Sequence, residues 1–176
     1  VTVADDGGSS GKLRTQLGVP PVGDIRNCIV ALADAEPLMG RLLQYRFPGD
    51  EAPESLAGHA IGNLLIAAMT AVEDGDFEEG VRRMNRVLAV RGQVVPASPT
   101  PLVLNAALRD GSLVVGQSLI AATTGIEQVW LAPEGVRASA AALAAIAEAD
   151  VIVIGPGRLF TSVLPGLLLP EIRDAL

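Results

Sequence analysis

The sequence is poor in cysteine, histidine and aromatic residues. It has one cysteine, Cys28, and one histidine, and its aromatic residues make up 3% of the chain. A single cysteine excludes an intrachain disulfide, and its place within an apolar helical pattern favours a buried structural thiol in a reducing compartment. With so few rings, alanine, leucine, valine and isoleucine must form the core, a composition typical of helices packed on a buried parallel sheet.

Positive charge and long apolar runs are also scarce. The net charge is −7, which argues against the clustered lysine and arginine that bulk nucleic-acid binding requires. The longest apolar stretch, residues 61–72, is too short to span a membrane, and no charged start precedes an apolar signal segment. These absences predict a cytoplasmic protein that binds neither nucleic acid nor membrane.

The 176 residues are the length of one domain, which can bury roughly 70% of its unfolded surface. Strand patterns alternate with helical patterns and predict a Rossmann-like three-layer α/β/α sandwich with a mostly parallel sheet. Strands are expected over residues 1–4, 126–131 and 151–154, and an antiparallel β-hairpin excursion over about 93–119, with its turn at Asp110 and Gly111. Helices are expected from Asp24, over 38–47, over 59–73, from Asp76 to Gly92 and over 138–149, and an exposed loop over 48–55.

Two aspartates are the expected N-caps of these helices. Asp24 precedes one apolar helical pattern, and Asp76 is followed three residues later by Glu79, as in a capping box. The segment over residues 59–73 is apolar nearly all round, which predicts a buried helix.

The stretch DDGGSSGK, residues 5–12, follows the first expected strand. It is not a Walker A motif, because three residues rather than four separate its outer glycines and a leucine follows its lysine. Small residues still let backbone amides approach phosphate oxygens, while hydroxyl and ammonium groups add donors. The candidate ligand contacts in this loop are Gly7, Gly8, Ser9, Ser10, Gly11 and Lys12.

The two aspartates that open this stretch have several possible roles. Asp5 and Asp6 can bind a ribose or sugar hydroxyl, or help to hold Mg²⁺. Capping of the loop's own amides carries equal weight for Asp6.

Three further segments supply polar residues beside glycine. GDIRN contributes Asp24, Arg26 and Asn27 at the start of a helix. GHAIGNLL places His59 and Asn63 four residues apart on one helical face; a hydrogen-bonding or ligand-contact role is favoured over a general base, because no nucleophile is evident. VIVIGPG ends in Gly155 and Gly157, which form either a second ligand loop or a structural turn.

These motifs, taken in order, resemble a known family. TVADDGGSSGKLR, GDIRNCIVALAD, LLQYRF, LAGHAIGNLLIAAM, VLAVRGQVVPAS and VIVIGPG…TSVLP are similar to the YvcK family within the broader CofD-like superfamily. The resemblance covers nearly the whole sequence. It implies one CofD/YvcK-like domain over residues 1–176, truncated at both ends.

The resemblance also implies a function. YvcK-like proteins bind UDP-sugars such as UDP-N-acetylglucosamine (UDP-GlcNAc) and are linked to carbon metabolism, peptidoglycan supply and cell shape in bacteria. The expectation is therefore a regulatory binding protein with no catalytic residue, with protein partners in cell-wall regulation and a possible homo-oligomeric state. Where the family tends to have a serine, Arg158 can pair with a diphosphate.

Two alternatives stay open. The sister branch comprises 2-phospho-L-lactate transferases, which move a phospholactyl group onto a deazaflavin with Mg²⁺. Asp5, Asp6 and Asp24 would then position the metal against a nucleotide diphosphate. The other alternative is an interaction module whose ligand loop has decayed.

Overall fold

A computed structural model describes residues 1–50 and 55–176, which form two compact units. The helical unit is Gly7–Val95, and the sheet unit combines Val1–Asp6 with Pro96–Leu176. Helices and a small sheet make this a mixed α/β protein, as predicted. The single-domain expectation stays a prediction, and within the expected loop over 48–55, residues 51–54 lie outside the described range.

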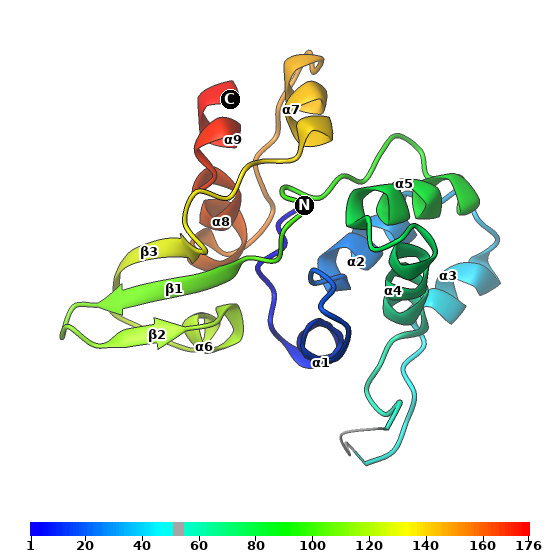
Figure 1. Ribbon diagram of the computed structural model, residues 1–176, viewed down its shortest axis with the longest axis horizontal. Coiled ribbons are helices and arrows are strands. Elements are labelled where there is room, and N and C mark those ends of the chain that lie inside the picture. Colours follow the sequence, from blue (N-terminus) through cyan, green and yellow to red (C-terminus); the bar gives the residue numbers. More distant parts are fainter. Residues whose placement is uncertain (51–54) are drawn as a thin grey trace. The chain divides into compact units, whose positions relative to one another are not determined.

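The helical unit contains five helices in its described residues (Figure 1). They are α1 (Gly8–Leu17), α2 (Gly23–Leu32), α3 (Pro37–Gln44), α4 (Ile61–Val72) and α5 (Phe77–Val87). Helix α4 packs against each of the other four. The core of this unit is aliphatic: Ile25, Ile29, Leu43, Ile66 and Val81 are each at most 1% exposed.

The predictions for two helices need correction, and the prediction for a third is confirmed. Helix α2 begins at Gly23 after Val22, so Asp24 lies in its first turn and is not its N-cap. Helix α4 begins at Ile61, and it is not buried all round, because Leu65 is 42% exposed. The predicted cap of α5 is confirmed: Asp76 accepts a hydrogen bond from the Glu79 backbone N–H at 3.0 Å.

The sheet unit contains β1 (Val103–Leu108), β2 (Leu113–Val115) and β3 (Ile126–Ala132). Their order is β2-β1-β3, and both pairs are antiparallel. The hairpin turn at Asp110 and Gly111 is confirmed, since the Asp110 carboxylate accepts from both the backbone N–H and the hydroxyl of Ser112. The remaining elements are α6 (Gln117–Ala121), α7 (Ala140–Ala147), the π-helical turn η1 (Leu159–Val163), α8 (Leu164–Leu167) and α9 (Pro170–Ala175).

Several expected strands do not form in the described chain. Residues 1–4 are not a strand, although Val3 is fully buried and its carbonyl accepts from the Leu102 N–H at 3.2 Å. Residues 93–97 form no strand, and the predicted strand over 112–118 shortens to β2 because α6 begins at Gln117. Residues 151–154, expected to be a strand, are exposed and irregular. No helix in the described residues is long and apolar enough to cross a membrane.

Candidate functional site

A chain of hydrogen bonds joins five of the predicted site residues inside the helical unit. The Ser9 hydroxyl lies 3.0 Å from His59 Nδ1 and accepts from Asn63 Nδ2 at 3.0 Å. Arg26 donates from Nη1 to Asn63 Oδ1 at 3.1 Å and from Nη2 to Asn27 Oδ1 at 2.6 Å. We call these five residues the buried polar network; four of them are at most 7% exposed, and only Asn27 is exposed.

The fixed donors in this network determine which atoms donate and which accept. Arg26 can only donate, so the Asn63 side-chain oxygen faces it and the amide nitrogen faces Ser9. The Ser9 oxygen therefore accepts from Asn63, and its hydrogen can be donated to His59 Nδ1. Which of the two groups donates in the contact between Ser9 and His59 depends on the imidazole tautomer.

Local sequence explains why these side chains meet. The serines are the second and third residues of α1, and the Ser10 hydroxyl accepts from the Gly23 N–H at 3.0 Å, which ties α1 to the start of α2. A Cβ at Gly62 would lie 2.8 Å from Arg26 Cγ and 2.8 Å from the Leu43 carbonyl oxygen. Only glycine at this position of α4 leaves room for the arginine side chain to reach Asn63.

Arg26 is a buried cation whose hydrogen-bond acceptors are neutral. It makes no ion pair among the described residues, and its buried Nε has no hydrogen-bond partner there. Burial lowers the pKa of Arg26, the nearby Arg46 lowers it further, and Asp24 opposes the shift. The positive charge is therefore only partly compensated within the protein, which favours an anion nearby.

Arg46 is the contributor that sequence reasoning missed. It donates to the Gly58 carbonyl at 2.8 Å, and its segment pairs with the one that contains His59, because the Phe47 N–H donates to the His59 carbonyl at 3.1 Å. In the sequence, LLQYRF contributes only to the family resemblance, and no spacing within it indicates a site.

The N-terminus of α1 presents glycines to this region. Gly7 is the N-cap, no side chain caps the helix in the described structure, and its first turn has no acidic residue. Gly8 has a φ of +47°, a backbone conformation that favours glycine. Gly11 and Lys12 lie in the following turn, half-buried. A helix start of this kind suits an anionic ligand.

The predicted site residues Asp5, Asp6, Gly155 and Gly157 belong to the sheet unit, where Asp6 and Gly157 have structural contacts. The Asp6 carboxylate accepts from the Ser118 N–H at 2.8 Å and so caps α6, not its own loop. A Cβ at Gly157 would lie 2.5 Å from the Ser162 Cβ, which supports the structural interpretation of that glycine. Arg158 donates to the Ala121 carbonyl at the end of α6 at 2.9 Å. Asp5 is half-buried and Gly155 is exposed.

The donor set does not fit a magnesium site in the described residues. No group of three or more His, Cys, Asp or Glu side chains there is placed to hold a metal ion. Asp6, one of the three proposed ligands, is already used as a cap.

Cys28 is unsuited to nucleophilic chemistry. Burial raises the pKa of its thiol, so the thiolate is disfavoured. The residue is half-buried and not fully buried as predicted, and its structural role stays a prediction.

A separate cavity of about 370 Å³ lies in the sheet unit, between the end of β3 and the α8–α9 junction. Its lining is largely apolar and includes Trp130, with the Arg137–Glu171 ion pair among the lining residues. It contains none of the predicted site residues.

The fold and the site define a mixed α/β protein with a buried polar network at a glycine-rich helix start. Comparison with known proteins places it more narrowly. The model of the family described as 2-phospho-L-lactate transferase CofD matches residues 1–176, and the chain belongs to this family.

The curated relatives are called gluconeogenesis factors, a name that differs from the description of the family model. The chain is 51% identical over its full length to the gluconeogenesis factor of Halalkalibacterium halodurans, and 50% identical over 99% of its length to that of Bacillus subtilis. It covers 54% of each relative, so it spans about half their length. A crystal structure of a Bacillus halodurans protein, described as a member of the UPF0052 family, matches 99% of this chain and 55% of its own with a TM-score of 0.93 and 50% identity.

Proposed function

We propose that the protein binds a UDP-sugar such as UDP-GlcNAc in the cytoplasm and acts as a regulatory protein of the YvcK type. The gluconeogenesis factors among its relatives support a regulatory role in carbon metabolism. Links to peptidoglycan supply and cell shape, through protein partners, are part of the same proposal.

One observation carries this proposal: the buried cation Arg26, hydrogen-bonded only to amide oxygens among the described residues, reaches Ser9 through Asn63 at the start of α1. A diphosphate at this helix start would meet backbone N–H groups, the positive end of the helix dipole and the field of Arg26. The exposed Asn27 is available to a sugar or ribose hydroxyl.

The same geometry favours binding over reaction. Ser9 is 4% exposed and its hydroxyl contacts both Asn63 and His59, so it is poorly placed to attack a substrate. His59 is buried within hydrogen-bond distance of that hydroxyl, and its ring helps to position it.

A matched pair of substitutions in α1 tests the ligand position. Gly8 and Gly18 both have positive φ, and a Cβ at either would meet nothing within 4 Å. Gly8→Ala and Gly18→Ala should therefore cost similar stability, of about 1 kcal/mol. Only Gly8 lies at the proposed diphosphate site, so we expect Gly8→Ala to weaken UDP-GlcNAc binding about tenfold, equivalent to about 1.4 kcal/mol, and Gly18→Ala to leave it unchanged.

Calorimetry on the complete native protein gives the readout. Equal effects of the two variants would remove α1 from the site. No binding of any nucleotide or nucleotide sugar by the complete protein would overturn the proposal and favour an interaction module.

The second candidate is a phospholactyl transferase, favoured by the description of the matching family. Mg²⁺-dependent transfer to a deazaflavin acceptor, measured by product formation with the complete protein, would establish it. UDP-GlcNAc binding without such turnover supports the first proposal.

A further inference from the structure

Arg46 lies where the chain leaves α3 and runs beside the start of α4. It forms an isolated antiparallel bridge with Ala60. Next to this bridge, the Ile61 N–H donates to the Tyr45 carbonyl at 3.0 Å. These contacts fix the backbone of Arg46, so its guanidinium extends from a defined position although the residue is exposed.

The protein itself uses only part of the Arg46 guanidinium. Nη1 donates to the carbonyl of Gly58, and the next residue, His59, lies against Ser9 in α1. In the part of the chain that the structure describes, the Arg46 side chain makes no other hydrogen bond and no ion pair. A guanidinium has five N–H donors in a planar fork that fits phosphate or carboxylate oxygens. Donors therefore remain for an anion next to the buried polar network.

Arg26 and Arg46 are neighbouring cations. A Cβ on Gly62 would lie 2.8 Å from both Arg26 Cγ and the Leu43 carbonyl oxygen, so the Arg26 stem lies against the end of α3. Burial lowers the pKa of Arg26 most, the charge of Arg46 lowers it further, and Asp24 opposes the shift without cancelling it. Both guanidinium groups have only neutral hydrogen-bond acceptors among the described residues. An anion beside both would replace this repulsion with attraction.

Two cations define the charge of the group that suits them. A group with one negative charge neutralises only one guanidinium, whereas a diphosphate has a negative charge on each of two adjacent phosphates. Paired hydrogen bonds between arginine and phosphate oxygens add a geometric fit. The chain as a whole has a net charge of −7, so a local pair of cations is needed to attract such a ligand.

We propose that Arg46 is a specificity-determining residue of the nucleotide-sugar site, which together with Arg26 binds the two phosphates of the ligand and selects a diphosphate over a single phosphate. This inference rests on the proposed UDP-sugar binding. It adds a binding residue from the segment after α3 and a physical reason for the choice of ligand. The glycine-rich start of α1 does not supply this selectivity, because backbone N–H groups at a helix start bind a single phosphate as well.

A matched pair of arginine substitutions in the complete native protein tests the role of Arg46. Arg41 in α3 is also exposed and makes no ion pair within the described residues. Arg46→Gln and Arg41→Gln remove the same charge. We expect Arg46→Gln to weaken UDP-GlcNAc binding about thirtyfold in calorimetry and Arg41→Gln to change it by less than about twofold. Arg46→Lys should recover only part of the affinity, because an ammonium group lacks the planar fork.

Competition with inorganic ions tests the selectivity. Pyrophosphate should displace UDP-GlcNAc from the wild-type protein at a concentration about tenfold or more below that of phosphate. The ratio of the two concentrations should fall towards one in Arg46→Gln and stay unchanged in Arg41→Gln. Without ligand, Arg46→Gln should have the melting temperature of the wild type, because the charge that it removes repels Arg26.

The outcomes separate this inference from the proposed function. If the wild type binds UDP-GlcNAc and both glutamine variants bind it equally well, the role of Arg46 is overturned and UDP-sugar binding stands. An unchanged ratio of pyrophosphate to phosphate in Arg46→Gln would overturn the selectivity. A melting temperature of ligand-free Arg46→Gln several degrees below that of the wild type would assign Arg46 a structural role instead. No binding of UDP-GlcNAc by the wild type would overturn the proposed function, and this inference with it.

Discussion

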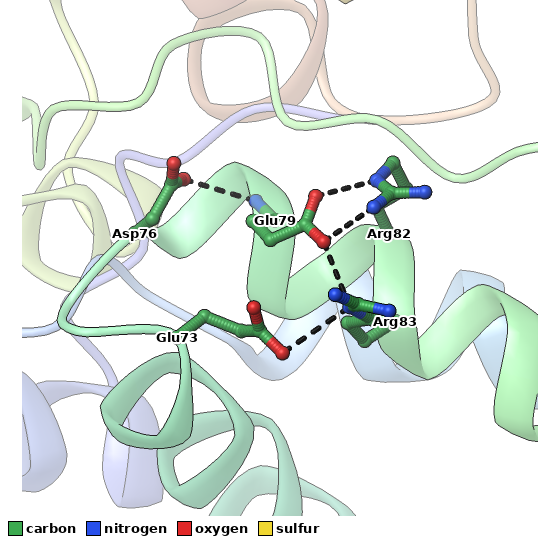
Figure 2. A network of polar contacts seen from close by, with 5 residues as sticks. All are labelled: Glu73, Asp76, Glu79, Arg82 and Arg83. Carbon is green, nitrogen blue, oxygen red and sulfur yellow. Dashed lines mark hydrogen bonds and ion pairs between the residues drawn. The ribbon is translucent and has the colours of Figure 1, made fainter.

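The helical unit contains two polar networks in opposite surroundings. Around the start of α5, Glu73 and Glu79 form ion pairs with Arg82 and Arg83 at the surface (Figure 2). In the buried polar network, a single cation meets the amide oxygens of two asparagines.

The difference lies in what happens when one member is lost. Water solvates any charge that loses its partner in the exposed network, so each pair contributes little. In the buried network a lost partner leaves a polar group with neither water nor a hydrogen bond, at a cost of about 1–3 kcal/mol or more. The network with fewer charges should therefore be the one on which the fold depends.

Removal of the central amide should have the largest effect. Asn63→Leu keeps the approximate volume but removes one hydrogen-bond partner from the Arg26 guanidinium and one from the Ser9 hydroxyl. We expect a loss of about 3 kcal/mol in the free energy of unfolding, measured by urea denaturation with far-UV circular dichroism. The control is Asn105→Leu in β1, which removes a buried asparagine with one longer bond of 3.3 Å and should cost about 1 kcal/mol. Equal losses of stability in the two variants would show that the network contributes no more than an ordinary buried hydrogen bond.

Steric pressure on the same network should have the next largest effect. Gly62→Ala removes no polar atom, but its Cβ would meet Arg26 Cγ and the Leu43 carbonyl oxygen at 2.8 Å. Because that carbonyl is backbone and cannot swing aside, we expect a loss of about 2 kcal/mol. Gly40→Ala in α3 is the matched control: its nearest contact would be Val30 at 3.9 Å, so helix propensity should stabilise it by about 0.5–1 kcal/mol. Thermal melts of both variants would show shifts of opposite sign.

Loss of a helix cap should have a smaller effect. Asp76→Ala removes the acceptor for the Glu79 N–H at the start of α5, and we expect a loss of about 1 kcal/mol. Ser139→Ala removes the corresponding bond to the Ala142 N–H in α7 and should cost a similar amount. A much larger loss at Asp76, seen in chemical denaturation, would mean that the exposed network depends on this carboxylate beyond capping.

Local signals made part of the structure predictable. The cap at Asp76 and the hairpin turn at Asp110 and Gly111 depend on residues within four positions of each other, so the sequence contains their determinants. Strands depend on partners that are distant in sequence. Residues 151–154 have a clear strand pattern, yet no strand forms without a neighbour to pair with.

The members of the buried polar network were predictable, but the hydrogen bonds between them were not. Ser9, Arg26, Asn27, His59 and Asn63 were all named from short polar segments beside glycine. The packing of α1, α2 and α4 determines these bonds. It places the Asn63 side-chain oxygen against Arg26 and the Ser9 hydroxyl against His59. Asp6 was named as a site residue, but it accepts a hydrogen bond from Ser118. Because Ser118 is 112 residues away, the sequence gives no signal of this contact.

Neutralisation of Glu79 should have the smallest effect and should depend on pH. The hydrogen bond with Arg82 is the main cause that lowers the pKa of Glu79, with further contributions from the charges of Arg82 and Arg83. A carboxylate whose pKa is lower in the folded state stabilises the fold above its unfolded pKa of about 4.3, and that contribution is lost as the pH falls through the folded value. Glu79→Gln should therefore have a slightly lower free energy of unfolding than the wild type at pH 7, and the same free energy below both pKa values. The loss of stability in Asn63→Leu should persist across this range. Denaturation at both pH values with low and high salt is the measurement. If Glu79→Gln lowered the free energy of unfolding as much as Asn63→Leu, the distinction between the two networks would be overturned.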